Sequence, residues 1–301
     1  MIKTQLLNPM FYAFIACFTI VQAGCSRGIG HTASNIITAD QLIEEIKKEQ
    51  PVTYHDVTFE GDINLLDIGL AQLTPNNFVA SIASPLYFER CEFKGKLIGF
   101  DHQGDTARVS HFLSAVSFIN CRFETEIDLR GSTFDHHLYF NTSLFDKNVQ
   151  LQAIKIAGDF RMEKAMFSEG LFLQEAVFSG NFWAKDATVL GQFSVQQADF
   201  WQNSVFAGLE VRGYADFGLT HFRRSAFFEY GKYDERANYS GAIFRHRAEW
   251  TQAQYEKHVD FSNAWFAYKP VFAGIKQKEL FTIVNARFDG GKPDNDFLFE
   301  N

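Results

Sequence analysis

Between Phe112 and Phe288 a large apolar residue returns every eleven residues, and this period restricts the fold more than any other feature. A second apolar series lies between the members of the first, so the steps alternate between five and six residues. Such steps fall on different sides of a helix with about 3.6 residues per turn, so the pattern is not helical. Gln277 alone interrupts the first series, which is Phe112, Phe123, Phe134, Phe145, Ile156, Phe167, Phe178, Val189, Phe200, Val211, Phe222, Tyr233, Phe244, Tyr255, Phe266 and Phe288.

A small residue often stands two positions before a member of this series, as Ala165 does before Phe167 and Ala198 before Phe200. Residues two apart point to the same side of an extended segment, so each unit is a short strand followed by a corner. Four such units make one turn, because the four columns differ in composition while residues 22 apart resemble one another. The sequence therefore predicts an all-β solenoid whose inner face is buried by neighbouring turns. The aromatic rows are interpreted as its core rather than as a ligand track.

Several stretches carry a family resemblance, among them AVFSGNFWAKDATV (176–189), AEWTQAQY (248–255) and VDFSNAWF (259–266). They resemble the pentapeptide-repeat proteins, in particular the divergent branch written F-x-x-A-x-F. The resemblance covers the chain from about Tyr54 to Phe288 and implies a right-handed quadrilateral β-helix with about 22 residues in each coil. The chain departs from the commonest family pattern, which prefers Leu at the centre and strict five-residue steps.

Residues 1–24 have the features of a signal peptide. Lys3 is their only charge, and the mostly apolar run 11–21 has the length of a signal core rather than of a membrane span. The following Ala-Gly-Cys resembles the end of a bacterial lipobox, which implies lipidation of Cys25, although Gln22 replaces the usual aliphatic residue. Ordinary signal-peptidase cleavage after Ala23 and retention of the segment as an anchor are the alternatives. Residues 25–38 are expected to form a tether.

Residues 39–50 are predicted to form a short amphipathic helix, with Asp40 as its N-cap and Pro51 ending it. We interpret this helix as the cap over the first open coil, and a helix lying on a membrane surface is the rival interpretation. The coil itself is placed at 51–288. Insertions that leave the period are expected near 66–87 and 99–110, where they are either binding loops or tolerated surface loops.

The tail at 289–301 contains no capping helix, so the last coil is expected to be an open strand edge. Two arrangements would cover it: the tail folds over the edge, or two molecules meet there as a homodimer. The dimer is suggested by what other pentapeptide-repeat proteins do.

Cysteines and one basic cluster supply further candidate sites. Cys91 and Cys121 occupy the small inward slot and are separated by one turn plus an eight-residue insertion. They are therefore either stacked free thiols or a candidate disulfide. The basic cluster is either a patch for an anionic lipid, glycan or acidic partner, or a solvated face. It consists of Arg223, Arg224, Arg245, His246 and Arg247.

The residues carry no recognisable catalytic or cofactor motif: there is no Gly-rich phosphate loop, H-E-x-x-H, G-x-S-x-G or C-x-x-C. The His136-His137 pair lacks ligand-spaced partners, so no metal site is expected. A filled coil offers no central pocket, which leads to the prediction of a non-enzyme without a cofactor. The net charge of −8, which becomes −9 when Lys3 is removed, argues against a nucleic-acid partner.

These observations favour a lipid-anchored envelope protein, held through its N-terminal lipid on the outer membrane or cell surface rather than the inner membrane. It would present a rigid surface to an unidentified protein or envelope component. The first alternative, suggested by the family resemblance, is a cytosolic DNA mimic that acts on a topoisomerase. The second is an enzyme or ligand-binding site built from the two insertions.

Overall fold

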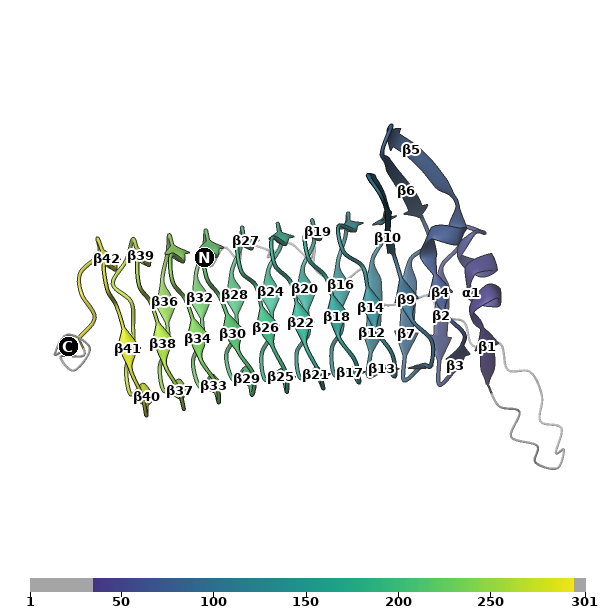
Figure 1. Cartoon of the computed structure of the whole chain (residues 1–301). Helices are drawn as coiled ribbons and strands as arrows, with labels where there is room; N and C mark the ends of the chain where they lie inside the picture. Colours follow the sequence, from purple (N-terminus) through teal and green to yellow (C-terminus); the bar gives the residue numbers. More distant parts are fainter. Residues whose placement is uncertain (1–34, 295–301) are drawn as a thin grey trace, which may run out of the picture. The chain divides into compact units, whose positions relative to one another are not determined.

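The computed structural model describes residues 35–294, which form one coil of four parallel β-sheets (Figure 1). The predicted signal peptide, Cys25 and the end of the tail lie outside the described residues. In each turn the chain passes through sheets A, C, D and B in that order. Arg122 in sheet A pairs with Leu144, its counterpart one turn later, so the predicted four-sided solenoid and its period are confirmed.

The four sheets are built almost entirely from two-residue strands. Sheet A contains β1 (Ile36–Thr38), β3 (Thr58–Glu60), β8 (Glu92–Phe93), β13 (Arg122–Phe123), β17 (Leu144–Phe145), β21 (Met166–Phe167), β25 (Thr188–Val189), β29 (Glu210–Val211), β33 (Lys232–Tyr233), β37 (Gln254–Tyr255) and β40 (Lys276–Gln277). Sheet B contains β2 (Val52–His55), β7 (Leu86–Glu89), β12 (Val116–Ile119), β16 (Leu138–Tyr139), β20 (Phe160–Arg161), β24 (Phe182–Trp183), β28 (Ser204–Val205), β32 (Ala226–Phe227) and β36 (Ala248–Glu249).

Sheets C and D face the other two sides. Sheet C contains β4 (Ile63–Asn64), β9 (Leu97–Ile98), β14 (Ile127–Asp128), β18 (Val149–Gln150), β22 (Leu171–Phe172), β26 (Phe193–Ser194), β30 (Ala215–Asp216), β34 (Ala237–Asn238), β38 (Val259–Asp260) and β41 (Phe281–Thr282). Sheet D contains β5 (Leu70–Thr74), β6 (Asn77–Ile82), β10 (Phe100–Gln103), β11 (Thr106–Phe112), β15 (Thr133–Phe134), β19 (Lys155–Ile156), β23 (Val177–Phe178), β27 (Asp199–Phe200), β31 (His221–Phe222), β35 (Ile243–Phe244), β39 (Trp265–Phe266) and β42 (Arg287–Phe288).

Two of the four corners in each regular turn need a residue with positive φ. One lies between sheets B and A, as at Asn120 (φ 54°), and the other between sheets C and D, as at Gly131 (φ 65°). Glycine adopts this left-handed conformation without steric strain, while other residues are strained by it. The same corners recur in the next coil, where they hold Thr142 and Ala153. Corner geometry thus repeats even where the residue type does not.

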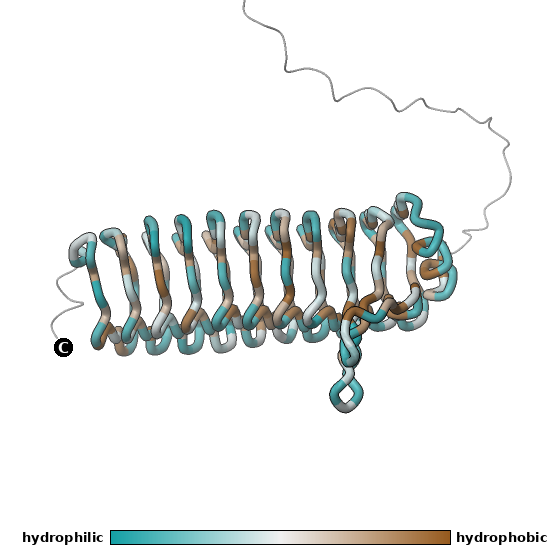
Figure 2. Tube along the Cα trace, turned by 90° about the horizontal axis from the view of Figure 1, so that it is seen from above, coloured by the Kyte–Doolittle hydropathy of each residue, from teal (hydrophilic) through white to brown (hydrophobic). Residues whose placement is uncertain are grey.

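The core is a set of aromatic columns that run along the coil. Phe112 stacks on Phe134 with 4.4 Å between ring centroids, and Phe123 stacks on Phe145 at 5.1 Å. Neighbouring columns meet edge to face, as Phe206 does with Phe217 at 5.4 Å. Both arrangements suit the charge distribution of aromatic rings. Figure 2 shows the matching alternation of apolar and polar segments along the chain. The aromatic rows are therefore core, as predicted.

The helix α1 (Ala39–Ile46) covers the first coil, which confirms the predicted cap. Leu42, Ile43 and Ile46 are buried against the aromatic columns. The predicted N-cap at Asp40 is wrong, because the N-cap is Thr38. The Thr38 hydroxyl accepts from the backbone N–H of Gln41, and the Gln41 side chain accepts from the backbone N–H of Thr38, which together form a capping box. The helix also ends at Ile46 rather than at residue 50.

The segment just before α1 is also part of the fold. Residues 36–38, predicted as the end of the tether, form β1 and pair in parallel with β3. The coil therefore begins before the helix, and α1 is inserted between the first two strands of sheet A. The result is a cap that is continuous with the sheet it covers.

Candidate interaction surfaces

Both insertions leave the coil at the same corner, between sheets C and D, and form antiparallel hairpins. The coil from Thr58 to its partner Glu92 and the next, from Glu92 to Arg122, are both longer than the regular turn. β5 pairs with β6 in one hairpin, and β10 with β11 in the other. β6 and β11 then pair in parallel over their whole shared length, Asn77–Ile82 with 107–112. The four strands make a single arm, ordered β5, β6, β11, β10, which projects from the coil (Figure 1).

The arm has an open cleft on each flank. One cleft of about 370 Å³ lies between the end of α1 and the arm and is lined by Ile46, Ile68 and Val79 among others. The other, of about 320 Å³, lies between the arm, β9 and the short 3-10 helix η1 (Leu65–Ile68), which contributes Asp67. Both volumes fall at the lower end of those typical of ligand sites. Each cleft could accommodate a few side chains of a partner protein.

Most ionisable side chains that line the clefts already have partners. Arg108 Nη1 lies 2.7 Å from Asp101 Oδ2, Asp67 accepts from Asn64 Nδ2 at 3.0 Å, and Lys47 pairs with Glu44. Neither His nor Cys lines either of these two clefts. The clefts therefore present neutralised, partly apolar walls, which suit contact with a polypeptide better than acid–base chemistry.

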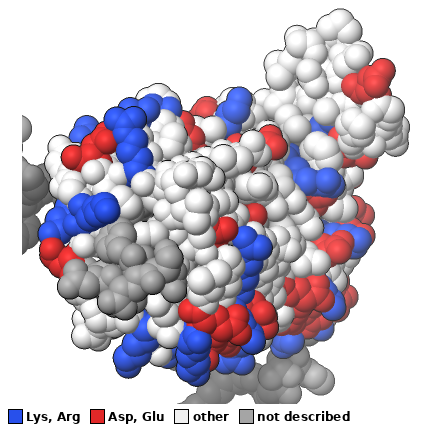
Figure 3. All heavy atoms as spheres, turned by 60° about the vertical axis from the view of Figure 1, so that its left-hand side comes forward, with Lys and Arg blue, Asp and Glu red and all other residues white. Residues whose placement is uncertain are grey.

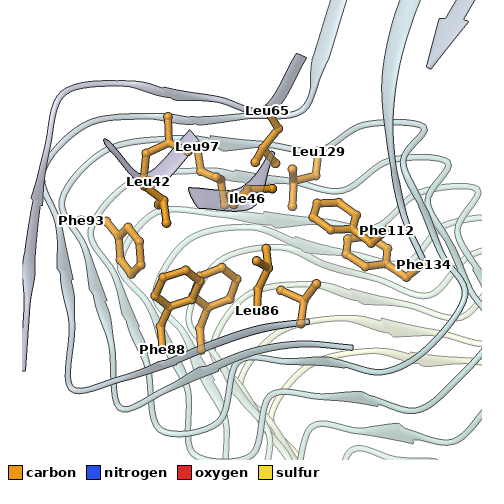
Figure 4. A pocket seen from close by; sticks show the side chains of 13 residues that line it. Leu42, Ile46, Leu65, Leu86, Phe88, Phe93, Leu97, Phe112, Leu129 and Phe134 are labelled. Carbon is orange, nitrogen blue, oxygen red and sulfur yellow. The ribbon is translucent and has the colours of Figure 1, made fainter. Parts of the chain in front are cut away.

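The interior offers much less room than the arm. A void beneath α1 has a volume of about 20 Å³ (Figure 4). Its walls are hydrocarbon, from Leu42, Ile46, Phe88, Phe112 and their neighbours. A site of this size could hold one water molecule, but a water there would find no hydrogen-bond partner. The void is a packing defect where the helix meets the coil.

The predicted basic cluster does lie together, at the corner where sheet D passes into sheet B. Arg223 and Arg245 follow β31 and β35, which are neighbouring strands of sheet D. Arg224 is exposed, His246 Nδ1 lies 3.0 Å from Ser225 Oγ, and Arg247 is paired with Glu249. The five residues therefore share one corner, as their spacing predicted.

Part of this charge is neutralised by residues that the sequence analysis missed. Nε and Nη2 of Arg223 both donate to Asp199 at 2.8 Å, and the carboxylate raises the pKa of the guanidinium further. Arg223 also stacks on Trp201, with its guanidinium carbon 4.3 Å from the ring centre. This ion pair could have been predicted from the sequence, because Asp199 precedes Arg223 by one coil plus two residues along an outer face.

Arg245 has an unusual partner. Its Nε donates to Nε2 of His221 at 2.6 Å, so this imidazole must be neutral to accept. Burial, followed by the nearby Arg223 and Arg245 charges, lowers the pKa of His221, which agrees with that role. Arg224, Arg245, His246 and Arg247 are all exposed; of these, Arg245 is bonded to His221 and Arg247 to Glu249.

Elsewhere, charges of both signs alternate over the surface, as the face in Figure 3 shows. Ion pairs link successive coils, for example Lys147 with Glu169 at 2.7 Å and Lys257 with Glu279 at 3.0 Å. Exposed pairs of this kind add little stability, about 0–1 kcal/mol each. They leave the outer faces chemically mixed rather than uniformly acidic.

Cys91 and Cys121 are neighbours on successive coils, in the inward slot before β8 and β13. Both are free and buried. Cys91 Sγ donates to Tyr54 O at 3.6 Å, and Cys121 Sγ to Phe88 O at 3.4 Å. The adjacent Cys91 and burial raise the pKa of Cys121, which disfavours its thiolate. Their disulfide stays a prediction.

The His136-His137 pair has a structural role. His137 Nδ1 accepts from the Asp159 backbone at 2.8 Å, which ties one corner to the next coil. Within residues 35–294 there is no group of three or more His, Cys, Asp or Glu residues placed to hold a metal ion. No helix in the same range is long and apolar enough to cross a membrane.

The last coil ends with β40, β41 and β42, and the tail then turns toward the corner between sheets D and B. Lys269 pairs with Asp294, and Pro293 is buried. Leu280 and Val284 are exposed on the last coil, where the preceding coil has His258 and Ser262. The predicted homodimer through this end stays a prediction.

We compared the chain with protein-family models, with curated proteins and with solved structures, and none of the three comparisons found a match.

Proposed function

We propose that the chain is a divergent pentapeptide-repeat protein that serves as a rigid, non-catalytic interaction scaffold, anchored by lipid in a bacterial envelope. The observation that carries the scaffold role is the four-stranded arm on an otherwise regular coil. Two insertions in successive turns leave at the same corner and pair with each other through β6 and β11. An ordered sheet that projects from a rigid coil and is flanked by two clefts is well suited to binding a partner.

The coil supports this role by its stiffness. Every turn is fixed to its neighbours by backbone hydrogen bonds and stacked rings, so a partner bound at the arm is held in a defined direction. The filled interior provides no room for a substrate. The mixed charge of the outer faces gives no support to the DNA-mimic alternative, which calls for phosphate-like rows of carboxylates.

The anchor rests on the lipobox-like sequence at 21–25, which lies outside the described residues. A lipid chain contributes about 0.8 kcal/mol for each buried CH₂ group, so two or more chains hold a protein firmly on a membrane.

The anchor is tested by replacing Cys25 with Ala in the full chain. We expect loss of metabolic labelling by a fatty acid and release from the membrane fraction, because the acylated sulfur is removed. Cys17→Ala is the matched control, because this cysteine lies within the predicted signal core and should leave labelling unchanged. An unlabelled, cytosolic wild-type chain would contradict the proposal and reopen the topoisomerase alternative.

The scaffold role is tested by removing the arm without disturbing the coil. Deletion of residues 68–79 and 101–108 returns both long coils to the regular spacing of the turns that follow. We expect the envelope partners trapped by chemical cross-linking of the wild type to disappear, while the melting temperature stays within a few degrees. Replacement of Arg224 and Arg245 by Ala serves as a control on a distant surface. Cross-linked partners that survive arm deletion would contradict the assignment.

A further inference from the structure

The arm has one edge that is open along its length. Every residue of β5 is exposed, including Leu70 at 42% and Leu73 at 66%. On its other side β5 pairs with β6, from Leu70 opposite Ala80 to Thr74 opposite Asn77, with a bulge at Leu73. The straight part of the edge is therefore Leu70–Gln72.

The register identifies which backbone groups of this edge are unpaired. The carbonyls of Asn76 and Ile82, at the two ends of β6, accept hydrogen bonds from the β11 side. The backbone N–H and C=O groups of even-numbered residues on β6 therefore point toward β11, and those of odd-numbered residues point toward β5. Val79 therefore bonds to its partner Ala71. The N–H and C=O groups of Leu70 and Gln72 consequently point away from the arm. This edge presents two donors and two acceptors.

Natural edge strands usually carry a charge or proline, or are very short, which prevents pairing with another chain. β5 has the sequence LAQLT, with neither charge nor proline. The other edge of the arm, β10, carries Asp101, which is held by Arg108, and His102. The edges at the end of the coil, β40, β41 and β42, are only two residues long. Of the edge strands within residues 35–294, β5 is the longest, at five residues, and every one of its residues is exposed.

We propose that the β5 edge pairs with the β5 edge of a second copy of this chain, antiparallel and about a two-fold axis through Ala71. Leu70 then exchanges both backbone hydrogen bonds with Gln72 of the other copy, and Gln72 does the same with Leu70. All four open groups on each edge are satisfied. The two arms become one continuous eight-stranded sheet, with each arm contributing the same surface.

A second copy is preferred over another extended partner because the edge complements itself. Ala71 would face Ala71 of the other copy at a non-hydrogen-bonded position, where Cα atoms approach to about 4.5 Å and a small side chain fits best. The strand has no charge to repel its copy. Since the arm projects from the coil, the pairing joins two arms rather than two coils. This inference does not depend on the lipid anchor.

The test is a site-directed cross-link in the full chain. Two cysteines at position 71 would have the Cα separation that a disulfide needs, about 4.4–6.8 Å. We expect Ala71→Cys to give a disulfide-linked dimer of the chain under mild oxidation, at least five-fold above the unmodified chain. Gln103→Cys, which is also exposed but lies on β10, is the matched control and should stay at background. Equal yields at the two positions, or an Ala71→Cys adduct with a different protein, would overturn the proposal.

A second measurement does not depend on oxidation. Ala71→Lys would place two positive charges opposite each other across the axis, while Gln103→Lys adds the same charge to the other edge. Sedimentation of the full chain in detergent should show association for the wild type and for Gln103→Lys, and at least a ten-fold weaker association for Ala71→Lys. A wild-type monomer across the concentration range, or unchanged association of Ala71→Lys, would refute pairing through β5.

Discussion

Trp250→Ala is expected to lower the free energy of unfolding by about 3–5 kcal/mol, because it removes the largest fully buried side chain of the core. Trp250 stacks on Phe228 at 4.8 Å and meets Phe244 edge to face at 5.2 Å. It also contacts Phe272 on the next coil at 4.9 Å. In a coil, no residue outside the neighbouring turns can move in to fill the gap. Urea unfolding followed by circular dichroism measures the loss.

The matched control is Trp201→Ala. This side chain is 47% exposed and lies on the outer face, where it stacks against Arg223. Its removal is expected to cost less than about 1 kcal/mol. Hydrogen exchange should further show that Trp250→Ala opens the coils after β36 before the rest of the chain. Equal destabilisation by the two substitutions would contradict the interpretation of the aromatic columns as the source of stability.

The regular part of the fold could be predicted because large apolar residues recur in every inner column at the interval of one turn. Phe178, Phe200 and Phe222 follow one another at intervals of one turn, and in the structure they stack at 4.9 and 5.0 Å. The period of such a repeat shows which residues pair between neighbouring turns, and an insertion in one coil is visible as a break in that period. The eight extra residues of the second insertion were therefore readable from the sequence, whereas the range predicted for the first, 66–87, is longer than the excess over one turn in the structure.

The structure that the two insertions form could not be predicted from the period. Before Ile82 and Phe112, the pairing of β6 with β11 joins segments of successive coils that lie outside the periodic series, so the geometry of the common corner brings them together. The N-cap was missed for a related reason. Thr38 and Asp40 are both good capping residues, and the choice depends on β1, whose pairing with β3 fixes where the helix begins.

The neutralisation of the basic cluster shows a third limit. Its arginines were found because they recur at the period of the turn, but their partners are displaced by two further residues along an outer face, where side chains of different columns meet. Arg223 with Asp199 and Arg122 with Asp146 both have this offset of one coil plus two. A search for opposite charges at that offset would have indicated that Arg223 is largely satisfied.

Stability is also expected to fall steeply above pH 10, because three tyrosines are buried in the last third of the coil. Burial raises the pKa of Tyr233, Tyr239 and Tyr255 well above the usual value of 10.0. Below pH 10 these hydroxyls are protonated in both the folded and the unfolded chain. Above it the unfolded chain releases protons that the folded chain keeps, so unfolding is favoured. Each group contributes about 1.4 kcal/mol per pH unit, or about 4 kcal/mol for the three.

Urea unfolding between pH 8 and 11.5 measures this slope, and Tyr233→Phe tests its cause. Tyr233 stacks on Tyr255 at 4.9 Å, and its replacement keeps the ring and leaves the contact between the Tyr239 and Tyr255 hydroxyls, 3.3 Å apart, in place. We expect little change at pH 7 and a slope about one third smaller above pH 10. Tyr230→Phe, at a position 57% exposed on the outer surface, is the matched control and should leave the slope unchanged. An identical slope in the wild type and both variants would mean that alkaline unfolding has another origin, such as release of the ion pairs between coils. The slope of the Tyr233→Phe variant therefore shows whether alkaline unfolding is caused by the buried tyrosines of the core or by the ion pairs of the surface.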